Sequence, residues 1–173
     1  MTIAHRIRLL TPADTSAYRE LRLEALRTHP DAFGASLADE EARTAEMIAK
    51  RLGAGPTNCL FGSFVDSELV GTAGFIIPNG SPKSRHKGLL VGVYVNPAHR
   101  GRAVGRALVQ AVIDHARGQV VLLQAAVGAA NIPALRLYKQ LGFRQYGLET
   151  KALLVGETYV DEALIVLDFT DVG

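Results

Sequence analysis

Residues 93–106 read Val93-Tyr94-Val95-Asn96-Pro97-Ala98-His99-Arg100-Gly101-Arg102-Ala103-Val104-Gly105-Arg106. An apolar, β-type run stops at Asn96-Pro97, a short basic loop with a glycine follows, and an amphipathic helix is expected from Val104. The first amides of a helix have no partner within the helix and point outward, so this order of elements predicts an anion site. Three arginines surround those amides, and a phosphate or pyrophosphate is the ligand that suits them.

Length and charge limit the class of protein. A chain of 173 residues, 48% of them hydrophobic, fits one domain spanning 1–173 with a buried core. The net charge of +2 is unevenly spread: residues 87–144 carry a net +7, and residues 145–173 carry a net −5. The centre therefore suits an anionic ligand and the C-terminal segment a cation. Solvated faces that cluster by sign explain the same distribution equally well.

Cysteine content and hydropathy indicate a cytoplasmic protein without a metal centre. Cys59 is the single cysteine, so no intramolecular disulfide can form, and no zinc-type cluster is present in the sequence. The N-terminal stretch is basic and too short in its apolar part for a signal peptide. No run of apolar residues has the length of a membrane span.

Hydrophobic spacing predicts the element order β-α-α-β-β-β-α-β-α-β-β. Strands are expected at 6–10, 59–65, 69–77, 89–95, 120–127, 143–154 and 158–169, and helices at 12–29, 39–52, 104–116 and 131–141. Strand–helix–strand pieces imply parallel pairing near the middle of the sheet, and hairpins imply antiparallel pairing at its flanks. The prediction is a mixed α+β fold with helices on both faces of one sheet. The almost continuous apolar run 120–127 predicts a buried central strand.

A second motif adds to the basic loop: Asn131-Ile132-Pro133-Ala134-Leu135-Arg136-Leu137-Tyr138-Lys139-Gln140-Leu141-Gly142-Phe143. It resembles the Asn-x-x-Ala-x-x-Leu-Tyr-x-x-x-Gly-Phe pattern of the GCN5-related N-acetyltransferase (GNAT) family. The loop Arg100-Gly101-Arg102-Ala103-Val104-Gly105 is similar to that family's Arg/Gln-x-x-Gly-x-Gly/Ala. The element order also matches, so the resemblance covers nearly the whole chain. One position departs from it, because Ala103 stands where the family usually has its first loop glycine, and a methyl group disfavours positive φ.

The resemblance implies acetyl-coenzyme A as the donor. The amides from Arg102 to Arg106 would hold the pyrophosphate, with charge-assisted bonds from arginine side chains. The pantetheine arm would lie along the strand that ends at Val95, and an amide near Val93 or Tyr94 would polarise the thioester carbonyl. The donor-binding residues implied in this way are Val93, Tyr94, Val95, Arg100, Gly101, Arg102, Ala103, Val104, Gly105, Arg106 and Asn131. Asn131 is also a helix cap by its position.

Tyr138 is the candidate catalytic residue. Loss of coenzyme A leaves a thiolate, and a phenol at the position where the family places its acid could protonate it. Packing of an aromatic side chain at helical spacing is the alternative interpretation of this tyrosine.

The base that takes the proton of the acceptor amine is not identified by the sequence. The strand 88–95 contains no carboxylate, and five residues remain only by default: Glu40, Glu41, His86, Asp161 and Glu162. Tyr94 and Tyr159 either line the acceptor pocket or pack.

Three functions stay open. The first is an N-acetyltransferase that moves the acetyl group of acetyl-CoA to a primary amine of a small molecule or a protein N-terminus. The second is a non-catalytic acyl-CoA-binding sensor or regulatory module on the same fold. The third, RNA binding through the basic segment, ranks last because few aromatics interleave there. No nucleic acid or membrane partner is expected, and an exposed edge in the final hairpin could pair two copies.

Overall fold

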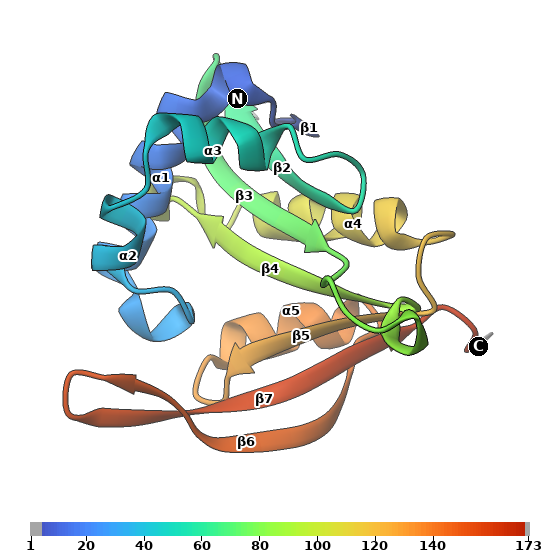
Figure 1. Cartoon of the computed structure of the whole chain (residues 1–173). Helices are drawn as coiled ribbons and strands as arrows, with labels where there is room; N and C mark the ends of the chain where they lie inside the picture. Colours follow the sequence, from blue (N-terminus) through green and yellow to red (C-terminus); the bar gives the residue numbers. More distant parts are fainter. Residues whose placement is uncertain (1–4, 172–173) are drawn as a thin grey trace.

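A computed structural model of the chain describes residues 5–171. Seven strands form one mixed sheet in the order β1-β2-β3-β4-β5-β7-β6 (Figure 1). They are β1 (Arg6–Leu9), β2 (Asn58–Val65), β3 (Glu68–Ile76), β4 (Lys87–Val95), β5 (Leu122–Gly128), β6 (Arg144–Val155) and β7 (Thr158–Asp168). Only β4 and β5 pair in parallel, and all other neighbours are antiparallel. The predicted mixed α+β fold is confirmed.

Helices cover both faces of the sheet and create two apolar cores. The helices are α1 (Thr15–Thr28), α2 (Leu37–Glu41), α3 (Ala45–Leu52), α4 (Val104–Ala116) and α5 (Ile132–Gln140), and a 3₁₀ turn, η2 (Pro30–Ala32), follows α1. One core joins α1 and α3 to side chains such as Leu60 and Phe64 of β2. The other joins α4 and α5 to side chains such as Phe75 of β3 and Leu123 of β5. Figure 1 shows α4 and α5 behind the sheet.

The two parallel strands separate along their length. They pair only where Lys87–Leu89 lies beside Leu122–Gln124, at the start of both strands. Beyond that point β4 is distorted, with a register shift against β3 and φ of +60° at Gly92. Figure 1 shows β4 and β5 diverging toward their C-terminal ends. The divergence leaves the main chain of the second half of β4 without a strand partner on that side.

Two sequence predictions differ from the structure. The helix expected at 39–52 is two helices, because Thr44 interrupts it and caps a new one: its hydroxyl accepts the amide of Met47 at 3.2 Å. The strand expected to be buried throughout is buried on one face only, where Leu123, Ala125 and Val127 alternate with more exposed residues. The helices α4 and α5 cover that face.

The junction of β1 and α1 is held by a charged pair at the predicted helix start. The guanidinium of Arg8 donates to both carboxylate oxygens of Asp14 at 2.8 Å, and the amide of Thr11 donates to Asp14 Oδ2 at 2.8 Å. The hydrogen bonds from Arg8 lower the pKa of Asp14 from 3.8 to about 2. Asp14 is buried, so these bonds are poorly screened by solvent.

Asp14→Asn should lower the free energy of unfolding by about 2 kcal/mol at neutral pH, as follows from the lowered pKa. The folded state holds the ionised carboxylate more tightly than the unfolded state does. This contribution is therefore complete above pH 3.8 and is lost as the pH falls toward about 2. Urea unfolding of both proteins over this range measures it. A stability difference that stays constant down to low pH would contradict the ion-pair explanation.

Candidate active site

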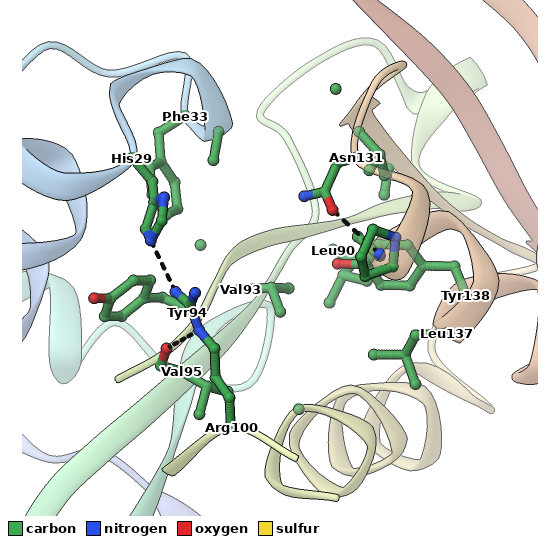
Figure 2. A pocket seen from close by; sticks show the side chains of 18 of the residues that line it. His29, Phe33, Leu90, Val93, Tyr94, Val95, Arg100, Asn131, Leu137 and Tyr138 are labelled. Carbon is green, nitrogen blue, oxygen red and sulfur yellow. Dashed lines mark hydrogen bonds between the residues drawn. The ribbon is translucent and has the colours of Figure 1, made fainter. Parts of the chain in front are cut away.

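A cavity of about 950 Å³ lies between the diverging strands β4 and β5. Its walls come from the second half of β4, the loop before α4, β5, the start of α5 and the segment around η2 (Figure 2). Eleven of the twelve residues predicted from the sequence line it: Val93, Tyr94, Val95, Arg100, Gly101, Ala103, Val104, Gly105, Arg106, Asn131 and Tyr138. Arg102 is outside this lining. The structure thus brings two motifs that are distant in the sequence to one cavity.

The loop before α4 turns through two left-handed residues. Gly101 has φ of +75°, and Ala103, the N-cap of α4, has φ of +61° and ψ of 12°. This conformation costs an L-residue roughly 1–2 kcal/mol, which is why glycine is common there. The departure from the family pattern therefore lies at a position that requires positive φ, and Ala103 adopts it. Val104 then begins the helix with its first amides free of intrahelical partners.

Ala103→Gly should raise the free energy of unfolding by up to about 1 kcal/mol, because relief of left-handed strain exceeds the entropy cost of glycine. Donor affinity should be unchanged or modestly higher. Gly101→Ala is the matched control: nothing lies within 4 Å of an added Cβ there, so its expected loss of about 1 kcal/mol comes from the backbone alone. Thermal unfolding and titration with acetyl-CoA measure both. A large loss of donor binding in Ala103→Gly would show that the conformation of this loop is different.

The three loop arginines have different surroundings. Arg100 donates through Nε to the carbonyl of Val95 at 3.0 Å, and its Nη2 lies 2.9 Å from His29 Nε2. Arg106, in the first turn of α4, is exposed and has only a 3.5 Å contact with Gln140 Oε1. Burial lowers the pKa of His5, and the nearby His99 and the positive charge of Arg102 lower it further.

The free edge of β4 presents main-chain groups to the cavity. The contact from Arg100 shows that the carbonyl of Val95 faces away from β3. Hydrogen-bonding groups of alternate residues in a strand point to the same edge, so those of Val93 face the cavity as well. The side chain of Tyr94 is buried, and its hydroxyl donates to Glu24 Oε1 at 2.8 Å. Burial raises the pKa of Tyr94. This tyrosine therefore both lines the cavity and joins β4 to α1.

The opposite wall comes from α5. Asn131 caps this helix, as predicted, with its side-chain oxygen accepting the amide of Ala134 at 3.2 Å. Tyr138 is 7% exposed and packs edge-on against Phe143, with ring centroids 5.6 Å apart. Burial raises the pKa of Tyr138 to about 12, so its hydroxyl is protonated at physiological pH. Figure 2 shows Tyr138 facing the cavity from the side opposite His29.

None of the five residues that the sequence offered as bases is among the described residues lining this cavity. Each of them has other surroundings. Glu40 is buried beside Arg22 and Arg43, and Glu41 pairs with Arg27. His86 precedes β4 at the end far from the cavity, Asp161 accepts a hydrogen bond from the amide of Lys151, and Glu162 lies opposite Glu149 in the β6–β7 pair. Burial, with a smaller effect from Glu149, raises the pKa of Glu162.

Sequence reasoning missed the residues that line the cavity from the end of α1 and η2. These are His29, Asp31, Ala32 and Phe33. The dipeptide His29-Pro30 indicated only the end of a helix, and nothing in the sequence placed that end near β4.

Comparison with known proteins agrees with this architecture. Residues 15–143 match the Acetyltransferase (GNAT) family. The match covers well over half of the chain, so the chain belongs to the GNAT family, and it is an acyltransferase. The N-alpha-acetyltransferase RimI of Mycobacterium tuberculosis is 33% identical over 138 residues, which are 72% of this chain and 85% of that protein.

A further relative matches in sequence, and solved structures share the fold. The mycothiol acetyltransferase of Thermomonospora curvata is 30% identical over 145 residues; the match covers 83% of this chain but 45% of that protein. A GNAT acetyltransferase from Streptococcus pneumoniae superposes with a TM-score of 0.84 at 21% identity, covering 95% of this chain and 99% of the other. A putative acetyltransferase from Salmonella typhimurium, solved with acetyl-CoA, gives 0.81 at 24% identity, covering 97% and 95%.

Within residues 5–171, no group of three or more His, Cys, Asp and Glu side chains is placed to hold a metal ion. In the same part of the chain, no helix is both long and apolar enough to span a membrane.

Proposed function

We propose that this protein transfers the acetyl group of acetyl-CoA directly to a primary amine, with Tyr138 as the general acid. The observation that carries the proposal is that the free edge of β4, the left-handed loop before α4 and the hydroxyl-bearing wall of α5 line one cavity. The acetyl-CoA complex of the Salmonella typhimurium protein supports acetyl-CoA as the donor for this fold.

Each wall of the cavity has its own task in this proposal. The amides at the start of α4 and the side chain of Arg106 bind the pyrophosphate, and Arg102 adds charge from outside the lining. The main chain of Val93 and Val95 binds the amides of the pantetheine arm, as an added strand would. An amide near Val93 or Tyr94 stabilises the negative charge that develops on the thioester oxygen.

The buried phenol suits protonation of a sulfur anion in the same site. A pKa of about 12 makes Tyr138 a weaker acid than a free thiol. Burial disfavours the departing thiolate as well as the phenolate, so the two shifts partly cancel when both groups share the cavity. Proton transfer from Tyr138 then accompanies cleavage of the carbon–sulfur bond.

The acceptor is a primary amine of a small molecule or of a protein N-terminus. Because RimI is an N-alpha-acetyltransferase, peptides with free N-termini are among the candidates. A panel of amino acids, polyamines, aminoglycosides and short peptides, incubated with acetyl-CoA, tests the proposal. A product heavier by about 42 daltons, the mass added by acetylation, together with free coenzyme A thiol is the expected result. Neither product with any acceptor would contradict it.

A non-catalytic acyl-CoA sensor is the second candidate. It is favoured by one observation: Asp31 is the one carboxylate among the described lining residues, and it is exposed. A sensor would bind acetyl-CoA and be stabilised by it through mass action without releasing thiol in the presence of amines.

A further inference from the structure

We propose that His29 is the base that removes the proton from the acceptor amine, and that Arg100 occupies its ring nitrogen until the donor binds. The inference rests on the proposed transfer from acetyl-CoA and supplies the group that the sequence left unidentified.

The protonation state of His29 follows from its contact with Arg100. His29 caps the C-terminus of α1, is partly buried and lines the cavity. Its Nε2 lies 2.9 Å from Arg100 Nη2. A guanidinium can only donate, so Nε2 must accept this hydrogen bond and the ring is neutral with its proton on Nδ1. Nε2 therefore carries the electron pair that a general base needs.

The other ionisable groups that face His29 are less suited to the task. Arg100 has no accepting atom. Tyr94, whose ring centroid lies 6.1 Å from that of His29, donates its hydroxyl proton to Glu24 behind it. Asp31, two residues further along in η2, is exposed to water. His29 is thus the lining side chain that combines an unprotonated ring nitrogen with partial shelter from solvent.

His29 also lies on the appropriate wall. Figure 2 shows His29 and Tyr138 on opposite sides of the cavity, with the β4 residue Val93 between them. Attack on a thioester needs a base on the side of the incoming amine and an acid on the side of the leaving sulfur. A substrate held along β4 separates the two residues in this way.

Arg100 links the availability of His29 to the donor. The same guanidinium donates to the carbonyl of Val95 at 3.0 Å, and Figure 2 shows both hydrogen bonds. In the proposed complex the pantetheine arm uses that carbonyl, and the pyrophosphate attracts the arginine charge. Donor binding therefore withdraws Arg100 from Val95 and His29 together and exposes Nε2 to the acceptor.

The step balances in atoms and electrons. His29 Nε2 takes one proton from the acceptor ammonium. The amine electron pair forms the bond to the acetyl carbon, the carbon–sulfur bond breaks with its electron pair on sulfur, and Tyr138 protonates the thiolate. The acylated nitrogen then gives up its second proton to water and becomes the neutral amide, and Tyr138 regains a proton from water. The imidazolium passes its own proton to water, so the whole transfer releases one proton.

Nuclear magnetic resonance of imidazole-¹⁵N-labelled protein tests the contact without an acceptor, using coenzyme A as the probe. In the free protein, His29 Nε2 should resonate as an unprotonated nitrogen that accepts a hydrogen bond. Saturating coenzyme A should move this resonance, and Arg100→Gln should move it in the same direction without ligand. His86, exposed and outside the cavity lining, is the internal control and should not respond.

An unmoved His29 resonance at saturation with coenzyme A would overturn the proposed contact. Failure of coenzyme A to bind at all would instead contradict the proposed function. The two failures are therefore distinguishable in one titration.

Kinetics with an amine identified by the acceptor panel tests the base. His29→Gln should lower kcat/KM roughly 100-fold, while acetyl-CoA still raises thermal stability as in the parent. Added imidazole should partly restore the kcat/KM of the His29→Ala variant. The control variant His86→Gln should have the same kcat/KM as the parent.

Full turnover in His29→Gln would overturn the assignment, as would an equal loss of kcat/KM in Asp31→Asn. If the parent acetylates no amine, the transfer itself is refuted together with its base.

Discussion

Tyr138→Phe should lower turnover by roughly 10- to 1000-fold, because it removes a positioned acid. Affinity for acetyl-CoA should change little, because the ring still packs against Phe143, with which it makes an edge-on contact at 5.6 Å. Without the phenol, the departing thiolate must take its proton from water inside a buried cavity. Steady-state kinetics gives the turnover, and calorimetry gives the donor affinity.

The pH profile adds an independent readout for Tyr138. Burial raises the pKa of this phenol to about 12, so it remains protonated throughout the range in which the protein can be assayed. Tyr138 should therefore contribute no alkaline limb to kcat. The Phe variant should reduce kcat by the same factor at every pH up to that limit.

Tyr18→Phe is the matched control. Tyr18 is 2% exposed and belongs to the core formed by α1 and α3, away from the residues that line the cavity. The change removes the same buried hydroxyl and should leave turnover intact. Intact turnover in Tyr138→Phe with lower stability or weaker donor binding would assign Tyr138 to packing.

Local signals in the sequence predicted the elements that form the site. The predicted helix 104–116 has the bounds of α4, and Gly142 of the second motif follows α5 with φ of +96°. Asp66 and Ser67, between the strands predicted at 59–65 and 69–77, form a tight turn from β2 to β3 with φ of +47° and +78°. These features depend on residues close in the chain, so capping and turn preferences suffice to identify them.

Features that depend on distant residues could not be predicted in the same way. The divergence of β4 and β5 is a property of the folded sheet, because pairing stops after Leu89 although the apolar pattern of both strands continues. The contact between His29 and Arg100 joins residues 71 positions apart. Residues such as Glu40 were therefore candidate bases only by default, and Glu40 is in fact buried beside Arg22 and Arg43.

Arg106→Ala should weaken acetyl-CoA binding roughly 10- to 100-fold at low salt, the value of one charge-assisted hydrogen bond to a phosphate. Arg106 lines the cavity in the first turn of α4, where the helix dipole also favours an anion. The 3.5 Å contact between its guanidinium and Gln140 Oε1 is weak, so Arg106 remains available to bind a ligand. Because the side chain is exposed, the loss should shrink as salt screens the charge.

Arg102→Ala removes the same charge from the same loop and is the control for Arg106→Ala. Arg102 is outside the cavity lining and close enough to His5 to lower the pKa of that imidazole. Its removal should weaken donor binding less than about threefold, through long-range attraction alone. The double variant should then behave like Arg106→Ala. Calorimetric titration at low and high salt measures the acetyl-CoA affinity of the three variants. Equal losses of affinity in the two single variants would show that net charge, rather than the geometry of the α4 N-terminus, attracts the pyrophosphate.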